Sequence, residues 1–272
     1  MIQSQRSPIG VFDSGVGGLT VLRELNHKLP HESILYFGDT ARLPYGTRSK
    51  GEIIGFVREI LSWMTDRGVK MVVMACNTSS ALALEEVRDE FRSLPVLGVI
   101  LPGAKSAVRC GRRIGVIATQ ATVQSDAYRR AILEIEPTAS VWQVACPEFV
   151  PLIEQNRIHD PYTLTVAQEY LRPLLRERID TLVYGCTHYR HLSPVFQKIL
   201  SPAITRIDPA QSVVKAIEKE LALLGLKNSH SSASVSFAVS GCPSTFAALS
   251  RQWLGFLPTV EKVYLPVSVK ID

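Results

Sequence analysis

The sequence has no apolar run of the roughly 20 residues that a membrane-spanning helix needs. Residues 1–8 contain no apolar core, so we expect no signal peptide. The formal net charge is only +5, and the basic residues are scattered rather than gathered in a stripe with interleaved aromatic residues. We therefore expect a cytoplasmic protein that binds neither a membrane nor nucleic acid.

The cysteines also lack the patterns of a disulfide framework or a zinc ribbon. The chain has five of them, an odd number, and no C-x-x-C pair. We expect reduced thiols. Cys110, Cys146 and Cys242 stand beside glycine or proline and are expected to be structural or incidental. Cys76 and Cys186 are left as the candidates for chemistry.

Short apolar runs typical of strands alternate with longer segments of helical periodicity. Residues 9–12, 69–75 and 179–184 are examples of predicted strands, whereas residues 79–91 and 122–133 are each predicted to form one helix. This alternation predicts an α/β fold with mostly parallel sheets flanked by helices. At 272 residues, the length favours two domains over one.

Two distant stretches, residues 72–78 and 182–188, share one layout. Each runs from an apolar strand through a small residue to a cysteine, followed by hydrogen-bonding residues. This indicates two related lobes, each with a cysteine at the carboxyl end of a strand, where α/β proteins bind ligands. Helix-start N–H groups there favour a thiolate, so we expect lowered pKa values for both thiols. A single such cysteine is more often inert, but the matched pair favours function.

Polar segments follow other predicted strands. Residues 13–18 form a loop rich in N–H groups that suits a carboxylate, although Asp13 is equally well explained as a helix cap. Residues 119–122 allow the same two interpretations. The turn at 44–46 could cover a site with its tyrosine ring or be simply a turn. Glu154 is either a surface residue or the partner of a thiol or a histidine.

Cys186, His188 and His191 allow two further interpretations. Their spacing could bind zinc, but a tight zinc site needs three or four ligands in tetrahedral geometry, and we expect no metal. A hydrolase with a Cys–His pair is the second alternative, and it leaves Cys76 unexplained. For the protein as a whole, a further alternative is a relative that has lost catalytic activity and only binds a regulatory partner. The two intact cysteines argue against it.

Five fragments, taken together and in this order, resemble the glutamate racemase family. They are residues 13–18, 44–46, 75–78, 146–154 and 185–189. The resemblance extends from about residue 9 to the last predicted strand at 260–265. Glu148 and Ser79 depart from the family pattern without touching the expected chemistry. Aspartate racemases and related two-cysteine racemases share the general plan and are the nearest alternative.

The resemblance implies two α/β lobes with the active site in the cleft between them. Residues 99–207 would form a second lobe inserted into a first one made of 1–98 and 208–272. Cys76 and Cys186 would exchange the α-proton of glutamate, with Asp13 assisting Cys76, and with His188 and Glu154 assisting Cys186. The substrate contacts implied by the family are Asp13, Ser14, Pro44, Tyr45, Gly46, Cys76, Asn77, Thr78, Thr119, Thr122, Cys186, Thr187 and His188.

The resemblance also carries expectations about cofactors and assembly. It implies a homodimer that uses no cofactor and supplies D-glutamate for peptidoglycan synthesis. Some relatives carry an N-terminal extension that binds a cell-wall precursor as an activator. Only eight residues precede the first predicted strand here, so we expect that control to be absent.

Overall fold

The structure is a computed structural model that describes residues 4–229 and 233–265. The strands are β1 (Ile9–Asp13), β2 (Ile34–Gly38), β3 (Met71–Met74), β4 (Val96–Gly98), β5 (Arg113–Ala118), β6 (Ser140–Ala145), β7 (Thr181–Gly185), β8 (Thr205–Ile207), β9 (Val235–Val239) and β10 (Val260–Lys262). The α-helices are α1 (Leu19–Lys28), α2 (Lys50–Asp66), α3 (Asn77–Leu82), α4 (Leu84–Glu90), α5 (Ile100–Cys110), α6 (Gln120–Gln124), α7 (Ala127–Ile135), α8 (Phe149–Glu154), α9 (Pro161–Arg176), α10 (Ser193–Ile199), α11 (Pro209–Leu223) and α12 (Pro243–Leu254). Short 3₁₀ turns are η1 (Thr40–Arg42), η2 (Tyr45–Thr47) and η3 (Thr187–Leu192).

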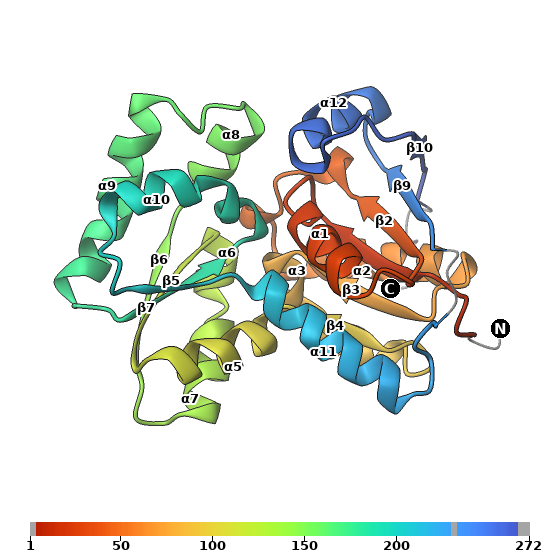
Figure 1. Ribbon diagram of the computed structural model, residues 1–272, viewed down its shortest axis with the longest axis horizontal. Helices are drawn as coiled ribbons and strands as arrows, with labels where there is room; N and C mark the ends of the chain where they lie inside the picture. Colours follow the sequence, from red (N-terminus) through yellow and green to blue (C-terminus); the bar gives the residue numbers. More distant parts are fainter. Residues whose placement is uncertain (1–3, 230–232, 266–272) are drawn as a thin grey trace.

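In the described residues, the strands form two sheets in which every pair is parallel (Figure 1). The six-stranded sheet has the order β10-β9-β2-β1-β3-β4, and the four-stranded sheet has the order β6-β5-β7-β8. Helices flank both sheets. We call the half built on the six-stranded sheet the first lobe and the other half the second lobe. The expected fold of two α/β lobes with parallel sheets is confirmed.

Both faces of each sheet are covered by apolar side chains. β1 and β3 are buried along their whole length, as parallel strands covered by helices should be. Val11 and Val73 belong to the core on one face of the first sheet, whereas Phe12 and Met74 belong to the core on the other. Side chains alternate between faces along a strand, so each sheet separates two layers of core.

Two of the predicted helices are each divided in the structure. Residues 79–91 contain the end of α3 and all of α4, with a break at Ala83, whose φ of −125° and ψ of −16° are not helical. Residues 122–133 contain parts of α6 and α7, separated by Asp126 in the left-handed region at φ 56°. The prediction of single helices is wrong because the spacing of apolar residues does not reveal a single residue with a non-helical backbone. Aspartate is one of the residues that tolerate the left-handed conformation seen at Asp126. Periodicity likewise does not indicate the short edge strands β4 and β8.

The two lobes are connected by more than the covalent crossovers. α11 packs against α1 of the first lobe and α5 of the second, and lies across the junction in Figure 1. Trp253 of α12 packs against a core cluster of each lobe. The relative position of the lobes is therefore defined by packed side chains on either side of the junction.

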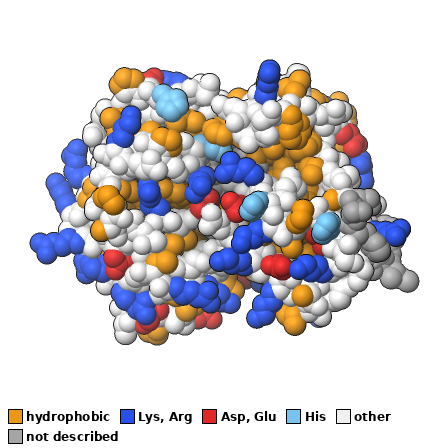
Figure 2. Space-filling model, viewed as in Figure 1, with side chains coloured by type: hydrophobic (Ala, Val, Ile, Leu, Met, Phe, Trp, Pro, Cys, Tyr) orange, Lys and Arg blue, Asp and Glu red, His pale blue; other side chains and the backbone are white. Residues whose placement is uncertain are grey.

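On the face shown in Figure 2, lysine and arginine side chains are spread over both lobes and form no continuous basic stripe. In the described ranges, no helix combines the length and the apolar character that crossing a membrane requires. The expectation that the protein binds no nucleic acid stays a prediction.

A buried ion pair joins segments of the first lobe that are distant in the chain. Lys70 Nζ lies 2.5 Å from Glu32 Oε2, and the two side chains are 0% and 1% exposed. Lys70 Nζ also donates to the carbonyls of Gln5 at 2.7 Å and Leu226 at 2.8 Å. Glu32 Oε1 accepts the backbone N–H of Asn228 at 2.8 Å. Both charges are thus compensated and hydrogen-bonded, as buried charges must be.

We expect Glu32→Gln to lower the free energy of unfolding by about 3 kcal/mol, because it leaves the Lys70 ammonium buried without a counter-charge. Urea unfolding followed by circular dichroism measures the loss. Glu218→Gln is the matched control, since its pair with Lys227 is about half exposed and should contribute less than about 1 kcal/mol. Equal losses in the two variants would contradict the role of burial.

Candidate active site between the two lobes

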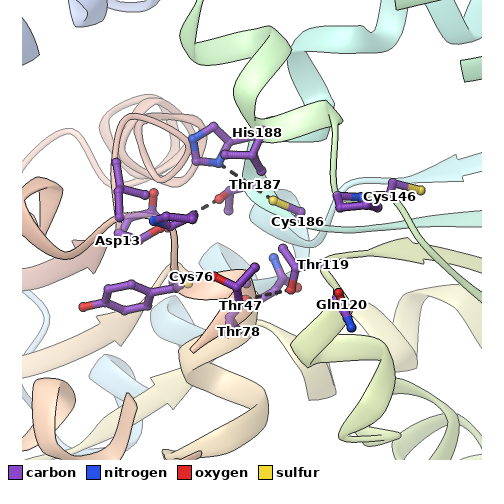
Figure 3. Close-up of a pocket in the computed structure, with 18 of the residues that line it drawn as sticks. Asp13, Thr47, Cys76, Thr78, Thr119, Gln120, Cys146, Cys186, Thr187 and His188 are labelled. Carbon is purple, nitrogen blue, oxygen red and sulfur yellow. Dashed lines mark hydrogen bonds between the residues drawn. The ribbon is translucent and has the colours of Figure 1, made fainter. Parts of the chain in front are cut away.

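A pocket of about 180 Å³ is lined by residues from both lobes (Figure 3). β1 and β3 of the first lobe and β5 and β7 of the second all end beside it, as expected for a ligand site of parallel sheets. Of the predicted site residues, only Glu154 and Thr122 do not line the pocket. The lining residues are Asp13, Ser14, Leu43, Pro44, Tyr45, Gly46, Thr47, Cys76, Asn77, Thr78, Thr119, Gln120, Cys146, Pro147, Val150, Pro151, Cys186, Thr187 and His188.

The first cysteine lies beside a buried carboxylate. Cys76 follows β3 directly at the start of α3, and Asp13 ends the neighbouring strand β1. Asp13 Oδ2 accepts the backbone N–H groups of Gly15 at 3.1 Å and Gly18 at 3.0 Å. Thr187 of the second lobe donates to Asp13 Oδ1 at 3.4 Å. Asp13 therefore organises the loop before α1 and also faces the pocket, so the two interpretations of this residue coexist.

The pKa of Cys76 corrects one of our expectations. Burial, followed by the nearby Asp13 carboxylate, raises the pKa of the Cys76 thiol to about 12. The prediction of a lowered pKa is wrong for this residue, because α3 has only six residues and its N–H groups do not outweigh desolvation. Cys76 is therefore a neutral thiol at neutral pH.

The second cysteine lies beside a histidine that is itself paired. Cys186 follows β7, and its Sγ is 3.8 Å from His188 Nδ1. His188 Nε2 is 2.7 Å from Glu154 Oε1 of α8. Burial alone would lower the pKa of His188, but its contacts with Cys186 and Glu154 raise that pKa well above the usual value. The imidazolium form is thus favoured next to the sulfur, and Glu154 is a partner of His188 rather than a free surface carboxylate.

Three threonine hydroxyls connect the lobes at the pocket. Thr78 Oγ1 of α3 is 2.9 Å from Thr119 Oγ1 and 3.3 Å from Thr122 Oγ1 in the second lobe. Thr119 also caps α6 by accepting the N–H of Thr122 at 3.3 Å. Capping and pocket lining therefore coexist here too. Thr122 does not line the pocket, but its hydroxyl contacts those of Thr78 and Thr119, which do.

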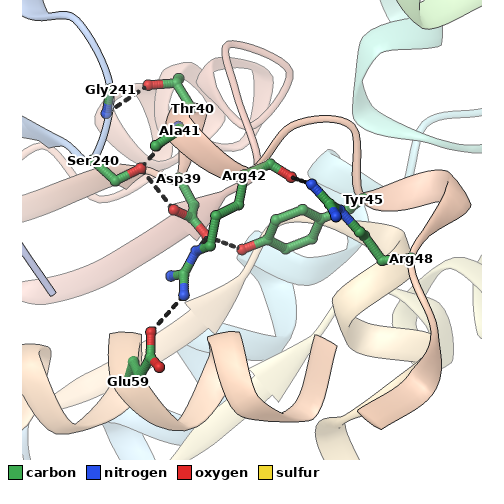
Figure 4. A network of polar contacts seen from close by, with 9 residues as sticks. All are labelled: Asp39, Thr40, Ala41, Arg42, Tyr45, Arg48, Glu59, Ser240 and Gly241. Carbon is green, nitrogen blue, oxygen red and sulfur yellow. Dashed lines mark hydrogen bonds and ion pairs between the residues drawn. The ribbon is translucent and has the colours of Figure 1, made fainter. Parts of the chain in front are cut away.

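A polar network holds the loop that carries Tyr45 (Figure 4). The Tyr45 hydroxyl donates to the Asp39 carboxylate, to which Arg42 Nε donates at 2.6 Å. Arg42 also pairs with Glu59 of α2 at 2.5 Å, and Ser240 Oγ donates to Asp39 Oδ1 at 2.7 Å. Burial and the Asp39 charge raise the pKa of Tyr45 well above its usual value. The turn at 44–46 is therefore a fixed wall of the pocket.

Glycines allow the lobes to approach closely around the pocket. A Cβ on Gly46 would lie 2.9 Å from Thr119 Cβ. A Cβ on Gly17 would lie 2.5 Å from His188 Nδ1 and 2.6 Å from Thr187 Oγ1. Any side chain at these two positions would displace the polar groups of the opposite lobe, which explains why the sequence has glycine there.

The remaining cysteines divide into one buried in the pocket wall and two exposed. Cys146 lines the pocket, and its thiol donates to the Val144 carbonyl at 3.6 Å. Burial raises its pKa well above the usual value, so it is a neutral part of the wall rather than an incidental residue. Cys110 and Cys242 are exposed. This position agrees with the structural interpretation of Cys146, although the sequence did not place this residue at the pocket.

The histidine that completes the zinc-like spacing has another contact. The ring of His191 stacks on Trp253 with centroids 3.4 Å apart, and burial lowers its pKa to about 3. In residues 4–229 and 233–265, no three His, Cys, Asp or Glu side chains gather as the ligands of a metal ion would. The two histidines of the Cys–x–His–x–x–His spacing therefore have different partners: His188 contacts Cys186 and Glu154, and His191 stacks on Trp253.

Comparison with known proteins gives consistent results. A family model described as Asp/Glu/Hydantoin racemase matches residues 9–217. The chain is 72% identical to the glutamate racemase of Microcystis aeruginosa, over 99% of this chain and 95% of that one. It is similar to a glutamate racemase isoform from Bacillus anthracis, with a TM-score of 0.93, 38% identity and coverage of 97% and 100%. It also resembles the glutamate racemase of Francisella tularensis, solved in complex with D-glutamate, with a TM-score of 0.90, 36% identity and coverage of 96% and 98%.

The two pocket cysteines should differ in their reactivity with iodoacetamide. At pH 7 we expect Cys186 to be alkylated at least about tenfold faster than Cys76, because the thiolate is the nucleophile and Cys76 is held as a thiol. Peptide mass spectrometry measures both rates, with the exposed Cys110 as an internal standard. Labelling of Cys76 should continue to increase up to pH 10. Equal rates for the two cysteines at pH 7 would refute the expected difference.

Proposed function

Because the chain belongs to the family described as Asp/Glu/Hydantoin racemase, we propose that it interconverts L- and D-glutamate by a two-cysteine proton transfer without a cofactor. One observation carries the proposal: two buried cysteines from different lobes line one pocket, and each has its own ionisable neighbours. The similarity to glutamate racemases over nearly the whole chain supports glutamate as the substrate.

Racemisation requires a proton acceptor on one face of the α-carbon and a proton donor on the other. In this proposal Cys186, next to the protonated His188, acts first as the proton acceptor, whereas Cys76 acts as the proton donor. Cys186 takes the α-proton, the electron pair stays on the substrate carbon and its carboxylate, and Cys76 delivers its proton to the opposite face. For the other enantiomer the roles reverse: Cys76 gives its proton to Asp13 and acts as the base, while Cys186 receives a proton from His188 and acts as the acid.

The carbanion-like transition state needs hydrogen-bond donors that are already aimed at the substrate carboxylates. The amide nitrogen of Asn77 has no hydrogen-bond partner among the described residues, so a bound carboxylate would satisfy it. Thr78 and Thr187 supply hydroxyls at the same pocket. In this proposal the substrate also contacts Asp13, Ser14, Pro44, Tyr45, Gly46, Cys76, Thr119, Cys186 and His188, with Thr122 supporting Thr119.

The proposal extends to the organisation of the protein. Residues 99–207 would form the inserted lobe, and residues 1–98 with 208–272 the other; these bounds lie between β4 and α5 and between β8 and α11. The family resemblance further suggests a cytoplasmic homodimer whose D-glutamate enters peptidoglycan synthesis.

Loss of the circular-dichroism signal of D-glutamate tests the reaction directly. With dialysed, reduced and chelator-treated protein and no added cofactor, we expect the signal to decay to zero. Cys76→Ser and Cys186→Ser should each lower kcat by about 10²–10⁴-fold, as expected for loss of a proton-transfer group. Cys110→Ser, at an exposed position, is the matched control and should keep the rate. A flat trace with folded wild-type protein, or full activity in either active-site variant, would overturn the proposal. The same assay with D-aspartate in place of D-glutamate tests substrate specificity.

The pH dependence tests the role of Glu154. The raised pKa of His188 means that its imidazolium form is present below that pKa and is lost as the pH rises through it. Glu154→Gln removes a carboxylate that raises this pKa, so the alkaline fall of kcat/KM should move to lower pH. Glu148→Gln is the control on the neighbouring residue before α8, where the carboxylate contacts Tyr162 and Tyr170 instead. If the alkaline fall of kcat/KM stays at the same pH in Glu154→Gln, Glu154 does not raise the pKa of His188 in the working enzyme.

A further inference from the structure

Tyr128 of α7 contacts the chain neighbours of both pocket cysteines, Asn77 and Gly185. Its side chain is fully buried in the second lobe, and its hydroxyl donates to Asn77 Oδ1 in the first lobe at 2.6 Å. Asn77 follows Cys76 directly in the chain. The Tyr128 ring packs on Gly185, the residue before Cys186, so closely that a Cβ there would lie 3.2 Å from the Tyr128 Cε2 atom. Tyr128 lies outside all the fragments that carry the family resemblance.

The contact with Asn77 determines which end of the amide faces a ligand. An asparagine side chain can turn over, which exchanges its accepting oxygen for its donating nitrogen. A hydroxyl that donates to the oxygen favours one of these orientations. In that orientation the amide nitrogen of Asn77 has no hydrogen-bond partner among the described residues, and Asn77 lines the pocket. Two N–H donors are therefore reserved for an acceptor such as a carboxylate.

We propose that Tyr128 is a positioning residue for substrate binding, whose hydroxyl orients the Asn77 amide so that its N–H groups meet a substrate carboxylate. This inference rests on the proposed racemisation of glutamate. Burial, followed by the charges of Asp208 and Cys186, raises the pKa of Tyr128 well above its usual value, so the phenol remains a donor at neutral and alkaline pH. The same residue links the lobes, because a shift of α7 would move both the Asn77 contact and the packing on Gly185.

Tyr128→Phe tests the inference, because it removes only the hydroxyl and keeps the ring on Gly185. We expect the KM for D-glutamate to rise about tenfold, the effect of losing one oriented hydrogen-bond donor, with a smaller change in kcat. Tyr170→Phe is the matched control: its hydroxyl contacts Glu148 at 3.1 Å, outside the pocket. A KM unchanged by Tyr128→Phe would overturn the inference.

A double-mutant cycle separates orientation of Asn77 from general packing. If Tyr128 acts through Asn77, then Tyr128→Phe should have little further effect in an Asn77→Ala background. Fully additive effects would overturn the inference, since they would mean that Tyr128 acts independently of Asn77. In the wild type, the side-chain amide signals of Asn77 should shift in NMR spectra when D-glutamate is added. Absence of that shift would overturn the inference without any variant having to fold.

Equilibrium binding distinguishes failure of this inference from failure of the proposed function. The dissociation constant of D-glutamate is measured by calorimetry for the wild type and for Tyr128→Phe, in parallel with racemisation. A wild type that binds D-glutamate without racemising it would refute the proposed function, while the tenfold weaker binding expected for Tyr128→Phe would still support the role of Tyr128. A wild type that does not bind D-glutamate would overturn both.

Discussion

Burial of Cys76 and Cys186 between the lobes makes their charged forms costly, because a thiolate removed from water needs a compensating partner. The chain meets this constraint differently on the two sides. Cys186 has the paired His188, whose raised pKa places a positive charge next to the sulfur. Cys76 has the Asp13 carboxylate, which opposes its ionisation and raises its pKa. The two similar halves thus give their thiols opposite neighbours, an imidazolium beside Cys186 and a carboxylate beside Cys76.

The geometry around the thiols depends on contacts made across the junction of the lobes. Thr187 donates to Asp13, and the hydroxyl of Thr78 lies against that of Thr119. Gly17 leaves room for His188 at a distance that no side chain would allow. Each half-site is therefore completed by groups from the opposite lobe. Such fixed donors cost little reorganisation when charge develops on a substrate.

Local patterns in the sequence predict the parallel α/β fold and the two cysteines, because buried strands and strand-end residues are encoded over a few neighbouring positions. They do not predict the division of helices at Ala83 and Asp126, where a single residue leaves the helical conformation. The direction of the Cys76 pKa depends on how deeply the thiol is buried, and no motif reports that. Contacts between distant residues are the hardest to anticipate: Tyr128 and Asn77 are 51 positions apart, and neither position has a pattern that indicates the other.

The strand order of the first sheet also has a consequence for the order in which the lobes can form during synthesis. β2 pairs with β9, a strand from the last part of the described chain, and Lys70 is held in part by the carbonyl of Leu226. The second sheet, by contrast, is complete once β8 at Thr205–Ile207 has been made. A growing chain can therefore assemble the four-stranded sheet of the second lobe while β2 still has an open edge. That edge is covered only after β9 has left the ribosome.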